Sequence, residues 1–333
     1  MEKKLFGKMY IFKILIAGFA SIIILSIILF MYSYVGFHKT NYNETTDYKW
    51  NPNQIIVKMN EGFAINVTDI NGYNNKDNNI IEPEILLMGS SHMEGFNVLF
   101  NNSVGKILNE KYSTYNIGIS GHQIYHCVKN IKKAVNYHKP KNIVIIETDE
   151  IDLGKEEMYK VVKDELESIK SYDNAVLGFL QKYFPAVKSI YQGIDDWRKV
   201  ELRKNSNKDI EKEYDQKYIE LLNEFIKKAN EPVKENQNKL IIFYHPNSKI
   251  DREGKLIDTT NPEALKLFKN ACDENEVIFI DMTEEFKKIY VEESKLAHGF
   301  SNTAIGVGHL NRYGHKIIAK TLLDTINKLE EEK

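Results

Sequence analysis

The sequence has very few cysteines and almost no net charge. Only Cys127 and Cys272 occur among 333 residues. This excludes a disulfide framework and a Cys-x-x-Cys metal motif, although a single disulfide between the two stays open. Lysine and arginine (45) nearly balance aspartate and glutamate (47), for a formal net charge of −2. That balance argues against nucleic acid as a partner.

Charged side chains are also absent from one long stretch near the amino terminus, which runs from Ile14 to Val35. Its length matches the roughly 20 residues that a helix needs to cross a bilayer. Lysines precede it, and Glu44 and Asp47 follow it. The positive-inside rule therefore predicts a cytoplasmic tail (1–13), a single transmembrane anchor (14–37) and an extracytoplasmic remainder in a bacterial cell membrane.

Strands and helices alternate after a predicted stalk and irregular lead-in at 38–83. Short apolar runs predict strands, and apolar residues spaced three and four apart predict helices. The predicted strands are 85–88, 114–121, 142–150, 239–247 and 277–282, and the predicted helices are 102–112, 124–138, 262–275 and the closing segment up to 333. A charged block at 156–236 has a helical pattern and is predicted to be an insertion into the domain formed by 84–333.

This alternation predicts an α/β fold, a three-layer α/β/α sandwich with a parallel central sheet. Ligands in such folds bind beyond the carboxyl ends of the strands. Five of these ends carry polar residues, and a sixth polar segment precedes the last helix. The six segments are Gly89-Ser90-Ser91-His92, Gly118–Gly121, Thr148-Asp149-Glu150, His245-Pro246-Asn247, Asp281 and Gly306–His315. Serine, glycine and histidine on one edge are what acyl-transfer chemistry requires.

Three of these segments resemble, in order, the sequence blocks of the SGNH (GDSL-type) hydrolase superfamily. They are "LLMGSSHMEG", "YNIGISG" and "GHLNRYGHKIIA". The resemblance implies an SGNH-like, flavodoxin-like sheet. It also implies Ser91 as the nucleophile, His309 as the base, and the Ser91 and Gly121 N–H groups as the oxyanion hole.

The sequence departs from the family pattern at two positions. Gly306 stands three residues before His309, where the family has the third member of its triad, an Asp. A carbonyl near Gly306, or the Asp281 carboxylate, could orient the imidazole instead. The third block normally supplies an Asn amide to the oxyanion hole, but this strand ends in Glu147-Thr148-Asp149-Glu150. A carboxylate cannot donate that bond, so Asp149 is a pocket candidate of open role.

Other polar residues have competing explanations. Ser90 stands where relatives have an Asp and is expected to be structural. His92 and His245 either line the pocket or are simply polar residues near the sheet edge. His122 and His126 have the i, i+4 spacing of a metal pair, but no carboxylate motif accompanies them, so neither a metal nor a cofactor is expected.

The resemblance to anchored, extracytoplasmic members implies a serine O-acyltransferase or esterase that acts on a surface or secreted polysaccharide. Its implied partners are a multi-pass membrane O-acyltransferase and the glycan synthase or export machinery. The alternative is an anchored glycan-binding or assembly subunit with weakened catalysis, for which the missing Asp and Asn are the support.

Overall fold

The computed structural model describes residues 2–33, 38–39, 49–58, 61–75, 82–167, 214–247, 249–251 and 253–331. The chain divides into two compact units, and the larger contains residues 36–171 and 212–333. Its strands are β1 (His38–Lys39), β2 (Lys49–Trp50), β3 (Ile55–Lys58), β4 (Ala64–Val67), β5 (Ile85–Met88), β6 (Thr114–Asn116), β7 (Ile143–Thr148), β8 (Lys239–Tyr244), β9 (Lys249–Ile250), β10 (Leu256–Ile257) and β11 (Ile278–Asp281). Its helices are α2 (Ser91–Glu94), the 3₁₀ turn η1 (Phe100–Asn102), α3 (Val104–Leu108), α4 (Ile124–His138), α5 (Lys155–Val162), α8 (Gln216–Glu235), α9 (Pro262–Glu274), α10 (Thr283–Glu293) and α11 (Arg312–Glu331).

The predicted parallel sheet is confirmed. Five strands pair in parallel in the order β11-β8-β7-β5-β6. Every residue of β5 and β7 is buried, as expected for central strands that helices cover on both faces. The order reverses between β5 and β7, and this switch point is where open parallel sheets bind their ligands.

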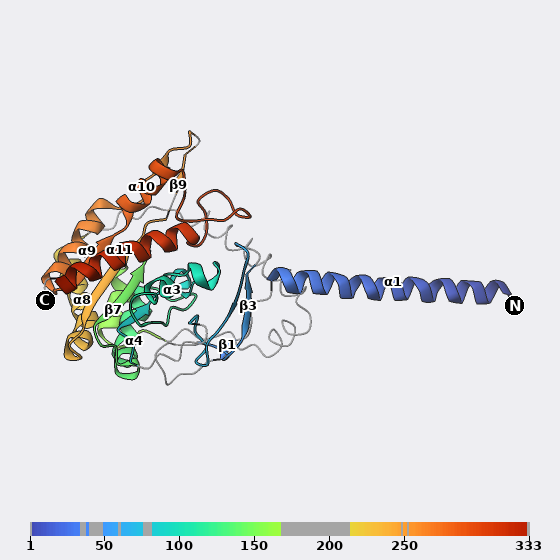
Figure 1. Cartoon of the computed structure of the whole chain (residues 1–333), viewed down its shortest axis with the longest axis horizontal. Helices are drawn as coiled ribbons and strands as arrows, with labels where there is room; N and C mark the ends of the chain where they lie inside the picture. Colours follow the sequence, from blue (N-terminus) through green and yellow to red (C-terminus); the bar gives the residue numbers. More distant parts are fainter. Residues whose placement is uncertain are drawn as a thin grey trace. The chain divides into compact units, whose positions relative to one another are not determined.

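Two helical layers cover this sheet, which confirms the predicted α/β/α sandwich (Figure 1). Alternate strand residues such as Leu87 and Ile145 share a core with α3, α10 and α11. Helices α4, α5, α8 and α9 form the other layer, in which α8 contacts each of the other three.

The lead-in at 38–83 is more regular than its sequence suggests, and the folded unit begins before residue 84. Strands β3 and β4 form an antiparallel hairpin. Trp50 is 1% exposed, and its indole N–H donates to Glu94 (2.5 Å). The Asn66 amide donates to the carbonyls of Phe96 and Val98. The lead-in is therefore part of the same folded unit as the sheet.

In the described part of the segment that we predicted to be an insertion, the helices are α5 and α8, and both belong to the sandwich. The α8 helix packs on β8 as well as on its neighbouring helices, and it buries Leu222, Phe225 and Ile226. Residues 168–213 lie outside the described part of the chain, so the rest of that prediction is not tested.

The amino-terminal helix α1 (Glu2–Ser33) belongs to the other compact unit. Its segment Tyr10–Ile28 has a mean hydropathy of 2.6, and none of it is buried. By length and composition this segment is able to cross a membrane. The predicted span began at 14 and ended at 37, and residues 34–37 lie outside the described part.

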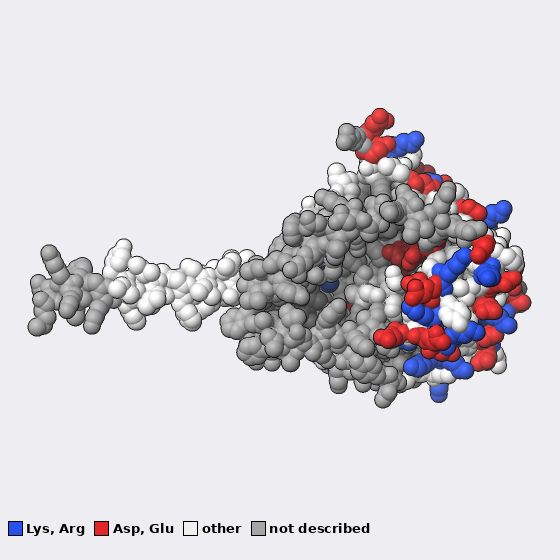
Figure 2. All heavy atoms as spheres, turned by 180° about the vertical axis from the view of Figure 1, so that it is seen from behind, with Lys and Arg blue, Asp and Glu red and all other residues white. Residues whose placement is uncertain are grey.

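The surface of the larger unit carries charges of both signs. Figure 2 shows lysine and arginine interspersed with aspartate and glutamate over its described part, without a large region of one sign. This pattern agrees with the net charge of −2 and gives no electrostatic footprint for a polyanion on that face.

We expect Leu87→Ala to lower the free energy of unfolding by about 2–5 kcal/mol, because it opens a cavity in the core beneath α3 and α11. Leu87 is fully buried, whereas Leu99 is 52% exposed. Leu99→Ala is the matched control and should change stability by less than about 0.5 kcal/mol. Urea unfolding of the full chain in detergent measures both, and equal losses would contradict this description of the core.

Candidate active site

The turn after β5 places Ser91 at the switch point of the sheet. The chain leaves β5 at Met88 and passes through Gly89 and Ser90, and Ser91 begins the short helix α2. Ser90 is the N-cap, and its Oγ accepts from the His92 N–H (3.1 Å). Ser90 is thus structural, and its cap sets the position from which Ser91 projects.

The Glu147 carboxylate holds this turn from the neighbouring strand β7. It accepts the Ser90 N–H (2.6 Å) and the Ser90 hydroxyl (3.2 Å). It also accepts from His245 Nε2 (2.9 Å), and both side chains of this pair are 0% exposed. Gly89 is required here, since a Cβ would lie 2.5 Å from Glu147 Oε2. These bonds satisfy a buried carboxylate that would otherwise be costly.

The structure brings Ser91 and His309 together from opposite ends of the domain. His309 Nε2 lies 2.8 Å from Ser91 Oγ, within hydrogen-bond distance for proton transfer. The His309 side chain is 30% exposed, so the pair is accessible to small reactants. His309 precedes α11, and Ser91 begins α2.

The third member of this group is Glu61, which lies between β3 and β4. Glu61 Oε2 is 2.6 Å from His309 Nδ1, and its other oxygen accepts the His309 backbone N–H. A carboxylate only accepts hydrogen bonds. The ring proton therefore lies on Nδ1, and Nε2 is left as the acceptor for the Ser91 hydroxyl.

The protein fixes Glu61 and lowers its pKa. The Asn97 amide donates to the Glu61 carbonyl (3.1 Å), and the Gly62 N–H donates to Asn302 Oδ1 (2.9 Å). Burial by itself would raise the pKa of Glu61, but hydrogen bonds and attraction from His309 outweigh it, so that the pKa lies below its ordinary value. The carboxylate is thus held charged against the imidazole.

Two backbone N–H groups near Ser91 remain open to a ligand. Among the described residues, neither the Ser91 nor the Gly121 N–H donates to a protein acceptor. The Ile119 N–H donates to the Gly89 carbonyl (3.0 Å), which holds the segment leading to Gly121 beside the Ser91 turn. Gly121 has φ +84°, a conformation that glycine adopts without strain.

His92 and Asp149 lie beside the Ser91–His309 pair. The ring centroids of His92 and His309 are 5.1 Å apart. His92 Nδ1 accepts the Leu310 N–H (3.2 Å), while Nε2 lies 3.9 Å from Asp149 Oδ2. Burial, reinforced by the neighbouring histidines, lowers the pKa of His92 well below its usual value. Burial first and the nearby Glu147 second raise the pKa of Asp149.

Asp281, Gly306 and His245, which the sequence suggested as orienting or pocket residues, do not hydrogen-bond to the Ser91–His309 pair. Asp281 caps α10 by accepting the N–H and hydroxyl of Thr283, and no carbonyl near Gly306 holds the His309 ring. The partner of that ring is Glu61, which corrects both suggestions. His245 is fully buried behind Glu147 and does not line the pocket.

Sequence reasoning missed Glu61 because it lies in no recognised block and 30 positions before Ser91 (91 − 61). Two signals were available in the sequence. His309 lacked the usual acid three residues before it, and Glu61 was a carboxylate in the predicted lead-in.

His122, His126 and the two cysteines have positions that the structure explains locally. His126 Nδ1 accepts the Gln123 N–H at the start of α4, and the His122 and His126 rings stack 5.4 Å apart. Within the described ranges, no group of three or more His, Cys, Asp or Glu is arranged to hold a metal. Cys127 and Cys272 are buried free thiols, so the disulfide that the sequence left open is not present.

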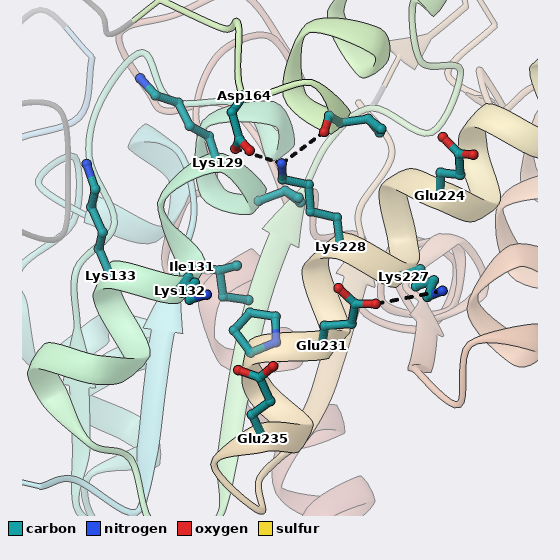
Figure 3. A pocket seen from close by; sticks show the side chains of 13 residues that line it. Lys129, Ile131, Lys132, Lys133, Asp164, Glu224, Lys227, Lys228, Glu231 and Glu235 are labelled. Carbon is teal, nitrogen blue, oxygen red and sulfur yellow. Dashed lines mark hydrogen bonds and ion pairs between the residues drawn. The ribbon is translucent and has the colours of Figure 1, made fainter.

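A separate groove of about 600 Å³ lies between α4 and α8, and none of the residues around Ser91 lines it (Figure 3). Its charges largely neutralise one another. Lys228 donates to Asp164 (2.7 Å) and to the Val162 carbonyl (3.1 Å), and Lys227 lies 3.8 Å from Glu231. Among the described residues, no serine, cysteine or histidine lines this groove, and it adds nothing to the Ser91 site.

Comparisons with known proteins find only distant similarity to solved structures. No family model and no curated protein matches the chain. Similar solved structures include the acetyl xylan esterase AlAXEase, with 12% identity over 73% of this chain and 98% of that one (TM-score 0.41). A GDSL-like lipase from Bacteroides thetaiotaomicron has 15% identity over 74% and 88% (TM-score 0.37). A member of the lipolytic protein G-D-S-L family from Veillonella parvula has 15% identity over 72% and 96% (TM-score 0.38). At this level of similarity their activities do not transfer to this chain, whose chemistry is argued from its own side chains.

We expect Glu61→Gln to destabilise the protein more at neutral pH than in acid. Because folding lowers the pKa of Glu61, its stabilisation is fully present above the unfolded value, near 4.5, and is lost as the pH falls through the folded value. The variant should lose about 1–3 kcal/mol of unfolding free energy at neutral pH. Urea unfolding at a series of pH values measures the difference, which should shrink below about pH 4.5. A difference that stays constant or widens in acid would contradict the charged Glu61–His309 contact.

Proposed function

We propose that this protein is a serine acyl-transfer enzyme that removes or transfers O-acyl groups on a cell-surface or secreted polysaccharide. The observation that carries the proposal is the chain of contacts from Glu61 through His309 to Ser91, with lengths of 2.6 Å and 2.8 Å. Carboxylate, imidazole and hydroxyl in this order are the arrangement that activates a serine nucleophile.

In the first half of the reaction, Ser91 Oγ attacks the ester carbonyl carbon. The Oγ proton moves to His309 Nε2, and Glu61 stabilises the imidazolium that forms. The carbonyl oxygen becomes an oxyanion, to which the Ser91 and Gly121 N–H groups can donate hydrogen bonds. When the tetrahedral intermediate collapses, the C–O bond to the alcohol breaks and His309 gives that alcohol its proton, which leaves an acyl ester on Ser91.

In the second half, water or a sugar hydroxyl loses its proton to His309 and attacks the acyl carbon. The ester bond to Ser91 then breaks, and Oγ recovers the proton from Nε2. Water as the acceptor makes the protein an esterase, and a sugar hydroxyl makes it a transferase. The two outcomes share every residue of the mechanism.

The polysaccharide substrate and the cellular setting follow from resemblance and from α1. The sequence blocks resemble anchored, extracytoplasmic hydrolase relatives, and Tyr10–Ile28 has the length and composition to anchor the chain. We infer a single-pass membrane location, with the site outside the cell and near a multi-pass O-acyltransferase and the glycan export machinery. The alternative, a binding subunit with weakened catalysis, relied partly on a missing acid, and Glu61 now occupies that role.

Ser91→Ala should abolish activity because it removes the nucleophile. The full-length protein in detergent is incubated with p-nitrophenyl acetate, and p-nitrophenol release is followed while mass spectrometry locates the acyl group. We expect release and a Ser91 acyl adduct in the natural protein and neither in Ser91→Ala. Ser301→Ala, at an exposed serine in the loop before His309, is the control and should keep both. No turnover and no adduct in the natural protein would favour the binding subunit.

Glu61→Gln should lower kcat by about 10²- to 10⁴-fold with little change in KM, because the amide neither fixes the Nδ1–H tautomer nor stabilises the imidazolium. The matched control is Asp281→Asn, which can still cap α10 and should leave kcat within a few-fold. The same p-nitrophenyl acetate assay measures both variants. If Asp281→Asn were the damaging change, the assignment of Glu61 would be wrong.

A further inference from the structure

The hairpin that carries Glu61 has an apolar outer face. Its cross-strand pairs are Ile55 with Val67 and Val57 with Ile65. Ile55, Ile65 and Val67 are 54%, 56% and 39% exposed. The inner face holds Ile56, Ala64 and Asn66, which are buried, together with Lys58. Antiparallel pairs with one solvated face normally place polar side chains on that face, and this hairpin places apolar side chains there instead.

A second apolar segment lies beside the first, in the loop before His309. Ile305 is 76% exposed and Val307 57% exposed. Asn302 Oδ1 accepts the Gly62 N–H (2.9 Å), and a Cβ on Gly62 would lie 2.9 Å from the Phe300 ring. This loop therefore packs on the hairpin turn.

Phe63, two residues after Glu61, is 61% exposed. We define the apolar rim as Ile55, Phe63, Ile65, Val67, Ile305 and Val307. Both parts of the rim adjoin the Glu61–His309 contact. Contiguous exposed apolar patches mark interaction sites on soluble domains.

The short distance along the chain between α1 and the hairpin favours a lipid surface as the binding partner of the apolar rim. The apolar segment of α1 ends at Ile28, and β3 begins at Ile55, so 27 positions separate them (55 − 28). That length spans at most roughly 90–100 Å when fully extended, so an anchored α1 confines the hairpin to the neighbourhood of the bilayer. Tethering converts a weak affinity into frequent contact.

The composition of the rim fits the same occupant. It contains only aliphatic and aromatic side chains, and the one charged residue of the hairpin strands, Lys58, pairs with the buried Ala64 on the inner face. Transfer of isoleucine, valine and phenylalanine side chains into the boundary between headgroups and acyl chains is favourable.

We propose that the apolar rim rests on the membrane surface, so that the Ser91 site opens at the bilayer interface. This proposal rests on the membrane anchoring in the proposed function but not on catalysis by Ser91. Docked in this way, the site takes its acyl donor or its glycan where it emerges from the membrane.

Lipid contact can be measured in the full-length chain reconstituted into phosphatidylcholine nanodiscs that contain nitroxide-labelled lipid. Ile65→Cys and Ile305→Cys are each labelled with an environment-sensitive fluorophore. The matched control is Val291→Cys, since Val291 is 80% exposed on α10, away from the rim. Cys127 and Cys272 are buried, so the unmodified chain provides the labelling blank.

We expect blue-shifted emission and nitroxide quenching at positions 65 and 305, and neither at 291. Adding Phe63→Ser to the chain labelled at 305 should reduce the quenching. Quenching at 65 and 305 no stronger than at 291 would overturn the proposal. Blue-shifted emission without quenching, together with disulfide cross-linking between two chains of the unlabelled Ile65→Cys variant, would assign the rim to a second copy and also overturn it. Because p-nitrophenyl acetate turnover is measured on the same samples, loss of catalysis is separable from loss of lipid contact.

Discussion

The hydrogen bonds of the Glu147 carboxylate are the constraint on which the site depends. Glu147 lies on β7 at the switch point, and it joins the Ser90 turn after β5 to His245 after β8. A fully buried carboxylate must have partners on both oxygens. Satisfying it fixes the turn that ends in Ser91, and it leaves room only for glycine at position 89. The sheet thus fixes the position of Ser91, the proposed nucleophile, independently of its contact with His309.

The other two members of the site come from segments that the sheet does not contain. His309 precedes α11, and Glu61 lies between two hairpin strands at the start of the domain. Their contact joins the first and last parts of the folded unit above the switch point. Ser91 Oγ contacts His309 Nε2, and His309 Nδ1 contacts Glu61, so the hydroxyl can pass its proton to an imidazole that the carboxylate holds in place. Glu61 contacts His309 from the start of the domain, whereas the family pattern has its acid three residues before the histidine, where this chain has Gly306.

The layered fold was predictable because central parallel strands are continuous apolar runs, and β5, β7 and β8 have that pattern. The approach of Ser91 and His309 followed from sequence blocks at the correct ends of those elements. The contact of Glu61 with His309 could not be predicted in this way, because no sequence pattern distinguishes a loop carboxylate that contacts a histidine from one that is exposed to solvent. The contacts of the lead-in were not predictable either. Its asparagines and weak periodicity predicted a stalk and an irregular segment, and the sequence did not indicate that Asn66 and Asn74 donate to carbonyls of the segment after β5.

The position of Glu61 has a consequence for release of the domain by proteolysis. A protease that cuts before Lys49 frees the sheet, the serine, the histidine and the carboxylate as one covalent piece. A cut between β4 and Ser91 leaves Glu61 attached to the other two groups only through noncovalent contacts, such as those from Asn66 to the Phe96 and Val98 carbonyls. Cleavage in the linker to α1 therefore keeps the three groups in one chain, whereas cleavage within the folded unit does not.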